Sequence, residues 1–311
     1  MADAGDRSDQ AIKAAQAGNF DALNRLVAGT PFDRHLRFLN FGYQVLDGEQ
    51  PQGPKLGFAF PNKDSAQLLF QVMADTPIDG RVVADVGCGR GGNLWLLRRH
   101  HAPAATVGID IASGSVRHAA DAAPAEGSCW AVGDAEQLPL RDQSVDVVLN
   151  VETGATYPHI ERFFREAVRV LRPGGHLLYA DIVHAQVVDA HRRSLAALGM
   201  EELEARDISA NVVAARDERS RRQALAFAAA AEEDRSAVAE FAGESGSVLY
   251  EVFAHGDHRY VIFRHRRAAV VPAPEAPLLT DEEAALAHET SLIAVRTLSL
   301  SGADRTDPPP A

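Results

Sequence analysis

The sequence predicts an α/β fold in which a mostly parallel sheet carries helices on both faces. From residue 81 to residue 185, short apolar runs alternate with segments of helical periodicity, which is the pattern of repeated strand–helix units. The first apolar run leads directly into the glycine-rich stretch DVGCGRGGN, residues 85–93. A tight glycine turn between a strand and a helix is where nucleotide-binding α/β folds hold their ligand, so both observations indicate one architecture.

Five strands and three helices are expected within this core. VVADVG at 82–87 is the first strand, because it ends in the glycine turn. SVDVVLNVE at 144–152 is a near-continuous apolar run, which is typical of a strand buried on both faces. The proline and glycines of RPGG at 172–175 end the last of the three helices. The other strands are expected at 105–111, 128–134 and 176–182, and the helices at 93–100, 113–123 and 159–171.

Two helical segments flank the core. Residues 1–30 carry a weak helical pattern, and residues 31–80 hold aromatic and glycine-rich pieces before one apolar helical stretch, SAQLLFQVMA. We therefore expect residues 1–80 to form an N-terminal helical cap or lid. Residues 186–246 are alanine-rich, without strand signals, and are predicted to form a helical insertion. The alanines and leucines of this insertion suit either an apolar lid over an acceptor or ordinary helix packing on the sheet.

The C-terminal part is expected to hold a hairpin and a tail. SVLYEVF at 247–253 and HRYVIFRH at 258–265 have strand-like composition and flank the turn AHGD. As a hairpin over 247–266 they would complete a Rossmann-like sheet of seven strands. Residues 267–311 hold several prolines and small polar residues, so we expect a largely disordered tail with one short helix at TDEEAALAH.

The charge balance argues against a nucleic-acid partner. With 31 lysines and arginines against 43 acidic residues, the formal net charge is −12. Proteins that bind DNA or RNA usually present a basic surface that displaces phosphate counterions. The arginine-rich run RDERSRR, residues 216–222, is therefore expected to be a solvated helix face.

The sequence favours a cytoplasmic protein without a membrane span. It contains no run of about 18 apolar residues. Its first ten residues lack the basic start and apolar stretch of a secretory signal. The two cysteines, Cys88 and Cys129, cannot build a metal cluster alone, so no metal site is expected, and a reducing compartment suits both. The residues leave open whether the chain forms a homodimer.

The glycine loop matches two nucleotide signatures at once. Gly87, Gly89 and Gly92 spell the G-x-G-x-x-G of a dinucleotide-binding turn. Read from Asp85, the same stretch spells the acidic D-x-G-x-G-x-G of a site for S-adenosylmethionine (SAM). Asp110, at the end of the second expected strand, could bind a ribose in either scheme. The loop alone therefore does not decide between a nicotinamide cofactor and SAM.

Two further acids favour SAM. Asp85 stands at the end of the first strand, where a carboxylate suits the ammonium and sulfonium of SAM but not a pyrophosphate. After the third strand, GDAEQLPL places Asp134 where it can accept from the exocyclic amine of adenine, with the backbone of Ala135 against the ring. Each acid alone could instead be a helix cap or a turn residue. Together with Asp110 they form an ordered series of acids at successive strand ends, which predicts SAM as the cofactor.

Over residues 81–185 the chain resembles the class I SAM-dependent methyltransferases. The motifs that carry the resemblance are VADVGCGRGG, GIDI, GDAEQLP, DVVLNVE and VLRPGGHLLYAD. The chain is particularly similar to the natural-product and lipid O-methyltransferases, including the mycobacterial phthiotriolone-type enzymes and polyketide or macrolide tailoring enzymes. These share the N-terminal NFGY, here residues 40–43, and a stretch of the form NVE…YPH after the fourth strand.

The resemblance implies a methyltransferase that acts on a hydroxyl of a hydrophobic small molecule of the secondary-metabolite or lipid-like kind. It also implies that Tyr43 helps to close the site over the methionine end of SAM. Asn150 would contribute contacts near the same end. The residues expected to bind the cofactor are Tyr43, Asp85, Gly87, Cys88, Gly89, Asp110, Ile111, Asp134, Ala135, Glu136 and Asn150.

The loop after the fourth strand departs from the pattern of these relatives. They usually carry NVE-x-x-H-x-YP, whereas this chain reads NVETGATYPH and has Ala155 at the histidine position. Because a hydroxyl nucleophile benefits from a general base, another group must take that part. His159 starts the next helix, whose dipole is expected to lower the pKa of the imidazole. The candidate catalytic residues are therefore His159, Tyr157 and Asp181, with His184 as a further histidine near the same pocket.

Other readings stay open at this point. His159 and His184 could be surface or capping residues. Without the usual histidine, C- or N-methylation on the same scaffold gains weight, since an enolate carbon or a neutral amine needs no strong base. A SAM-binding protein that catalyses a cyclisation or rearrangement without methyl transfer is a further alternative. A nicotinamide dehydrogenase and an RNA methyltransferase are disfavoured, by the acids and by the net charge respectively.

Overall fold

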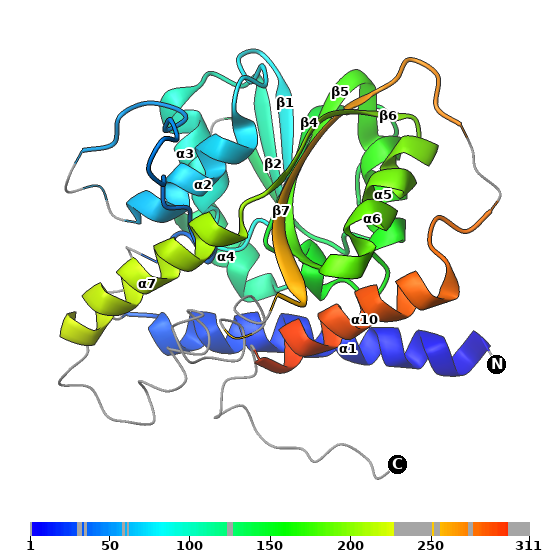
Figure 1. Ribbon diagram of the computed structural model, residues 1–311, viewed down its shortest axis with the longest axis horizontal. Coiled ribbons are helices and arrows are strands. Elements are labelled where there is room, and N and C mark those ends of the chain that lie inside the picture. The colour runs from blue at the N-terminus through cyan, green and yellow to red at the C-terminus, as the bar shows by residue number, and fades with distance from the viewer. Residues whose placement is uncertain are drawn as a thin grey trace, which may run out of the picture.

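The structure is a computed structural model that describes residues 2–29, 33, 36–57, 60, 62–122, 127–226, 251, 256–272 and 276–297. Its centre is a seven-stranded sheet with the strand order β3-β2-β1-β4-β5-β7-β6 (Figure 1). β7 runs antiparallel to its neighbours β5 and β6, and the other pairs are parallel. The predicted mostly parallel α/β sheet is confirmed. The strands are β1 (Val82–Val86), β2 (Ala105–Asp110), β3 (Ser128–Val132), β4 (Val145–Val151), β5 (Leu171–His184), β6 (Met200–Asp207) and β7 (His258–Arg267).

Helices cover both faces of the sheet. One apolar cluster packs α2, α3 and the start of α7 against one face, and a second packs α5 and α6 against the other (Figure 1). β4 is buried along nearly its whole length, as its apolar run predicts. The described helices are α1 (Ala2–Val27), α2 (Lys63–Met73), α3 (Gly92–His100), α4 (Ser113–Ala122), α5 (Ile160–Val170), α6 (Val188–Ala197), α7 (Ser209–Ala226) and α10 (Asp281–Thr297), with the short 3₁₀ turns η1 (Gly154–Thr156) and η2 (Ala185–Val187).

The first and last described helices lie beside each other. α1 and α10 contact one another, and α10 also contacts η1, the turn that follows β4 (Figure 1). The end of the sheet at which β1, β2 and β4 finish is thereby covered by helices from opposite ends of the sequence. Within the described part of the chain, no helix is both long and apolar enough to cross a membrane.

The sixth strand is not where the sequence pattern placed it. The prediction that residues 186–246 contain no strand is wrong, because β6 occupies Met200–Asp207. β6 is an edge strand of mostly exposed residues, so it lacks the apolar alternation that marks a strand. It pairs with β7 through the antiparallel backbone ladder, and ion pairs link the two strands as well, such as Arg266 Nη2 to Glu201 Oε2 at 2.6 Å. The predicted partner strand at 247–253 lies outside the described residues apart from Glu251, which is helical.

The C-terminal segment is more ordered than predicted. A largely disordered tail is wrong for residues 281–297, which form α10. Thr280 and Glu283 form a reciprocal capping box, in which the Glu283 N–H donates to Thr280 Oγ1 at 3.2 Å and the Thr280 N–H donates to Glu283 Oε2 at 2.9 Å. Ala294 and Val295 are buried near the other end of the helix. Residues 273–275 and 298–311 of the predicted tail lie outside the described part.

Candidate functional site

A cavity opens where the carboxyl ends of β1, β2 and β4 meet. It encloses about 1190 Å³, counted with its open mouth. Its floor is the glycine loop, and one wall is the segment 151–158 after β4. α1 contributes Lys13, Gln16 and Phe20 to the lining, and α10 contributes Ala294. The cavity therefore lies at the point where the sheet topology of α/β proteins places ligands, and the two terminal helices cover it.

The glycine loop presents bare backbone to this cavity. Gly87, Gly89 and Gly91 all have positive φ, at 74°, 50° and 77°. A Cβ on Gly87 would lie 2.5 Å or less from the side chain of Thr153, so the loop could not follow this path with a larger residue. The N–H groups of Gly87 and Cys88 both donate to the carbonyl of Ile109 at the end of β2.

Asp110 joins the glycine loop to the end of β2. Its Oδ2 accepts from the Gly89 N–H at 2.8 Å, and its Oδ1 accepts from the Ala112 N–H at 2.9 Å. The residue lines the cavity, although only 8% of its surface is exposed. Burial raises the pKa of this carboxyl to about 6, despite the two backbone bonds, which favour the charged form.

Asp85 lies beneath the loop and does not line the cavity. It is fully buried, and its nearest donor is Asn93 Nδ2, 3.4 Å from Oδ1. Its Oδ2 has no hydrogen-bond partner among the described residues. Burial, and to a smaller extent the nearby Asp110 carboxylate, raises the pKa of the Asp85 carboxyl to about 7. Its position suggests support for the loop from below more than direct contact with a ligand.

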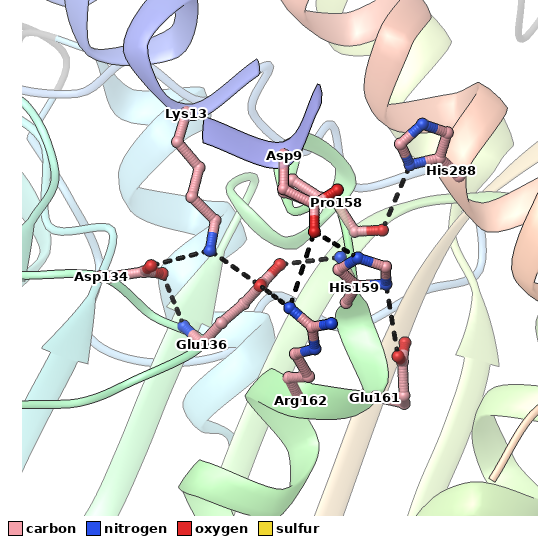
Figure 2. A network of polar contacts seen from close by, with 9 residues as sticks. All are labelled: Asp9, Lys13, Asp134, Glu136, Pro158, His159, Glu161, Arg162 and His288. Atoms are coloured by element: carbon pink, nitrogen blue, oxygen red, sulfur yellow. Dashed lines mark hydrogen bonds and ion pairs between the residues drawn. The ribbon is translucent and has the colours of Figure 1, made fainter. Parts of the chain in front are cut away.

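The acids after β3 are held by a lysine of the N-terminal helix (Figure 2). Lys13 Nζ lies 2.7 Å from Asp134 Oδ2 and 2.8 Å from Glu136 Oε2. Asp134 Oδ1 also accepts from the Glu136 N–H at 2.8 Å. Burial lowers the pKa of Lys13, but the bonds to both carboxylates outweigh this and raise it. Asp134 and Ala135 line the cavity, whereas Glu136 lies behind them, with 3% of its side chain exposed.

His159 belongs to the same polar network and is not among the cavity-lining residues. Figure 2 shows its Nε2 facing Asp9 Oδ2, at 2.7 Å, and its Nδ1 facing Glu161, at 3.5 Å. The bond to Glu161, followed by the bond to Asp9, raises the pKa of the imidazole against the effect of burial. The expectation of a lowered pKa at the start of α5 is therefore wrong, because two carboxylates outweigh the helix dipole.

Asn150 and Tyr157 form a hydrogen-bonded cluster at the end of β4. Asn150 Nδ2 lies 2.9 Å from the Val86 carbonyl, 2.7 Å from Thr153 Oγ1 and 2.8 Å from the Tyr157 hydroxyl. Tyr157 lines the cavity and is 7% exposed. Burial raises the pKa of the Tyr157 phenol well above its ordinary value, so it stays protonated and serves as a hydrogen-bonding group.

Asp181 supports the loop that carries Ala155. Its Oδ2 accepts from the N–H groups of Thr153, at 2.9 Å, and Ala155, at 3.1 Å. Its Oδ1 accepts from the Ile182 N–H at 2.8 Å. Asp181 and Ala155 both line the cavity, and burial raises the pKa of the Asp181 carboxyl to about 7. No histidine is among the described residues that line the cavity.

The segment NFGY is tied to the loop after β4. Glu152, whose φ is 55°, accepts from the Phe41 N–H with both carboxylate oxygens, at 2.7 and 2.9 Å. This places Asn40 and Phe41 in the cavity wall, but Tyr43 turns away from it. The Tyr43 hydroxyl donates to Glu49 Oε2 at 3.0 Å, and the residue is 2% exposed.

The structure therefore separates the residues chosen from the sequence into two groups. Those that line the cavity are Gly87, Cys88, Gly89, Asp110, Ile111, Asp134, Ala135, Tyr157 and Asp181. Those that stand outside the lining are Tyr43, Asp85, Glu136, Asn150 and His159.

Sequence reasoning missed the lining residues of the two terminal helices and Arg37, which stands just before NFGY. These residues belong to none of the motifs, so no local signal identifies them. The Thr280–Glu283 capping box lies at the start of the C-terminal helix that the sequence predicts at TDEEAALAH, so it marks where that helix begins and not how far it extends.

Comparisons with known proteins agree on one family. The model of the methyltransferase domain matches residues 84–179. The phthiotriol/phenolphthiotriol dimycocerosates methyltransferase of Mycobacterium leprae is 33% identical over 236 residues, covering 73% of this chain and 84% of the relative. The fatty-acid O-methyltransferase of Mycolicibacterium smegmatis is 35% identical over 182 residues, covering 58% of this chain and 65% of the relative.

Several matches are partial. The chain spans 65% of the length of the phthiotriol/phenolphthiotriol dimycocerosates methyltransferase 1 of Mycobacterium ulcerans, at 34% identity over 57% of this chain. Among solved structures, the [4+2]-cyclase SpnF superposes with a TM-score of 0.59 at 24% identity, covering 78% of this chain and 96% of that one. A geranyl diphosphate methyltransferase in complex with SAM gives a TM-score of 0.55 at 16% identity, covering 75% of this chain and 100% of that one. At these identities the solved structures show a shared fold.

Proposed function

This chain belongs to the SAM-dependent methyltransferase family, and we propose that it transfers the methyl group of SAM to a hydroxyl of a hydrophobic, lipid-like small molecule. One observation carries the proposal. A single cavity brings together bare glycine backbone, the Asp110 carboxylate and the Asp134–Ala135 turn. These groups follow three neighbouring strands. They therefore offer a ligand hydrogen-bond acceptors and a flat backbone surface along the edge of the sheet.

The described residues fit SAM. Asp110 stands beside Gly89 and can accept from ribose hydroxyls, while the backbone of Ala135 can lie against adenine. Asp134 already accepts from the Glu136 N–H and pairs with Lys13, so α1 is linked to the acid expected to meet the adenine amine. When bound, SAM supplies an activated methyl group on a sulfonium. The chain's own task is then to align the acceptor and exclude water.

Two helices serve the exclusion of water. Phe20 of α1 and Ala294 of α10 line the cavity on the side away from the sheet. Phe38, Phe41 and Ile182 add further apolar surface. An apolar lining of this kind suits a hydrophobic acceptor, and the names of the mycobacterial relatives point to lipid-like substrates.

We assign the proton-accepting role to Asp181. His159 faces Asp9 outside the cavity lining, and the Tyr157 phenol is held protonated by burial. The Asp181 carboxyl lines the cavity next to Ala155 and has a pKa of about 7, which suits a general base near neutral pH. Its Oδ1 accepts one hydrogen bond, from Ile182, and keeps a second lone pair for a substrate proton.

A second candidate is a reaction that needs no strong base. The described cavity lining contains Ala155 and no histidine, and this favours an enolate carbon or a neutral amine as the nucleophile, or a rearrangement without methyl transfer. These reactions share the SAM site with the first proposal. Carbon and nitrogen methylation differ from it in the acceptor, and the rearrangement differs in that no methyl group is transferred.

The test is a transfer assay with methyl-labelled SAM and a matched set of acceptors. A long-chain alcohol, the corresponding fatty acid, a β-ketoester and a primary amine of equal chain length are compared, and products are analysed by mass spectrometry. The label on oxygen supports the proposal. The label on carbon or nitrogen selects the second candidate. Tight SAM binding in calorimetry with no label on any acceptor, including a small-molecule extract of the source organism, would contradict methyl transfer.

A further inference from the structure

Three cationic side chains are among the described residues that line the cavity: Lys13, Arg37 and Arg90. Two of them are paired. Lys13 bridges the two acids after β3, as described above. Arg90 lies against Asp33, and its Nε donates to the carbonyl of Leu36 at 2.6 Å. Arg37 makes neither an ion pair nor a side-chain hydrogen bond with any residue in the described ranges.

Arg37 is held beside the glycine loop. A Cβ on Gly92 would lie 2.5 Å from the Arg37 carbonyl oxygen, so the two backbones are in close contact at the start of α3. A Cβ on Gly89 would lie 3.4 Å from Leu39 Cδ1, two residues after Arg37. Residues 37–39 therefore run along the loop that forms the cavity floor.

The guanidinium of Arg37 is positioned by an aromatic ring. It lies 5.1 Å from the centroid of the Trp95 ring, which holds it in a cation–π contact. Arg37 is partly buried, and burial lowers its pKa although the group remains charged. No acid that lines the cavity pairs with Arg37 in the described ranges. Asp134 pairs with Lys13. Asp110, Glu152 and Asp181 accept from backbone N–H groups.

We propose that Arg37 is a binding residue for a carboxylate inside this cavity. The inference rests on the proposed function and adds a ligand group to it. A partly desolvated guanidinium without an anion is unfavourable, and its planar N–H groups match a carboxylate in two parallel bonds. Two molecules in the proposed reaction can bring a carboxylate: SAM through its amino-acid end, or the acceptor if it is a hydroxy fatty acid. The chemistry is the same for both.

Binding calorimetry distinguishes the two sources. SAM and decarboxylated SAM are titrated into the wild-type chain, Arg37→Met, Arg37→Lys and the control Arg99→Met. Arg99 also lies over the Trp95 ring, at 5.7 Å, but is not a lining residue, so its loss reports on the ring contact alone. Thermal melting checks that each variant is folded.

If the carboxylate is that of SAM, Arg37→Met weakens SAM binding about tenfold to hundredfold, the scale of a charge-assisted bond, and leaves decarboxylated SAM within about threefold. Arg37→Lys keeps part of the preference for SAM over decarboxylated SAM, and Arg99→Met keeps all of this preference. If the carboxylate is that of the acceptor, Arg37→Met leaves both forms of SAM within about threefold. It instead selectively weakens a fatty acid relative to the alcohol of equal length, each titrated in the presence of decarboxylated SAM.

Equal losses for all four ligands in Arg37→Met, or no loss for any of them, would overturn the assignment while leaving the proposed function intact. A wild-type chain that binds neither form of SAM would instead overturn the proposed function, and the assignment with it. The two failures are therefore separate results of one titration series.

Discussion

Gly89 donates its backbone N–H to Asp110 Oδ2 over 2.8 Å, so one carboxylate fixes the glycine loop to the end of the neighbouring strand. The other oxygen of the same group accepts from Ala112 at the start of the next helix. Asp110 thus shapes the cavity floor before any ligand is present. A side chain chosen from the sequence as a ribose-binding residue is also a structural part of the loop.

Substitution of Asp110 should therefore weaken SAM binding. Asp110→Ala removes the acceptor for ribose hydroxyls and for the Gly89 N–H. The expected loss is about 1.5–3 kcal/mol of SAM binding free energy, the scale of charge-assisted hydrogen bonds. Calorimetry measures it. The control is Asp142→Ala, whose carboxylate is 73% exposed and pairs with Arg169 away from the cavity lining. Equal affinity in Asp110→Ala and the wild type would refute the assignment of Asp110 to the cofactor site.

A methyl group on Gly87 should disrupt the loop. The Cβ would lie between 2.3 and 2.5 Å from atoms of Thr153, and the φ of 74° is unfavourable for alanine. Gly80→Ala is a matched control, because Gly80 has a φ of 71° and open space around the added carbon. We expect Gly80→Ala to lower the free energy of unfolding by about 1–2 kcal/mol through the backbone alone.

Gly87→Ala should lower the free energy of unfolding by about 1–3 kcal/mol more than the control, because Thr153 must move. Since Thr153 Oγ1 hydrogen-bonds Asn150 and Tyr157, the cavity wall should shift with it. Urea unfolding of the two variants, together with SAM titration, checks both parts. If the two variants lose the same stability, the predicted clash with Thr153 is absent.

Local sequence patterns predicted the strands and helices whose burial leaves a periodic apolar pattern in the sequence. β1 to β5 were found because apolar runs alternate with amphipathic helices and glycine turns. β6 was missed because its residues between Met200 and Asp207 are mostly charged and exposed, so its pairing with β7 leaves no apolar alternation in the sequence. α10 was underestimated because its buried residues all lie in its second half, and two of them, Thr290 and Ser291, are polar.

The site was predictable where it coincides with strand ends. Asp110 and Asp134 follow β2 and β3 and line the cavity, as their spacing indicated. The contacts of Lys13 with Asp134 and of His159 with Asp9 were not predictable, because each joins residues more than a hundred positions apart in the chain. No local motif specifies that α1 lies over the ends of β3 and β4, so its acidic and basic residues could not be paired from sequence alone.

The ion pair between His159 and Asp9 should make stability depend on pH. The pKa of His159 is raised above its ordinary value of 6.5, mainly by Glu161 and then by Asp9. A raised histidine pKa contributes stability that is fully present below 6.5 and is lost as the pH rises through the folded-state pKa. We therefore expect His159→Gln to be less stable than the wild type at pH 5.5 by about 0.5–1 kcal/mol, and nearly equal to it at pH 9.

Urea unfolding at the two pH values, extended to Asp9→Asn and the double variant, measures the coupling between the residues. Because the buried histidines, such as His191 and His265, are present in all four proteins, their own titration cancels in the comparison. A stability difference between His159→Gln and the wild type that is equal at both pH values would contradict a charged His159 in the folded chain.

The proposed base role of Asp181 gives the rate a defined pH dependence. Only the carboxylate accepts a proton, and burial raises its pKa to about 7, so kcat/KM should fall about tenfold per pH unit below that value and level off above it. Asp181→Asn should lower kcat by about 10²–10⁴-fold and abolish this pH dependence, while SAM affinity stays within about threefold. His159→Gln is the control and should keep the wild-type profile, because His159 is not a lining residue. If Asp181 only positions the Ala155 loop, Asp181→Asn should behave differently, because the asparagine keeps one carbonyl oxygen for the Thr153 and Ala155 N–H groups. The variant would then keep the wild-type pH dependence of kcat/KM at a reduced rate. That result would show that another group is the base.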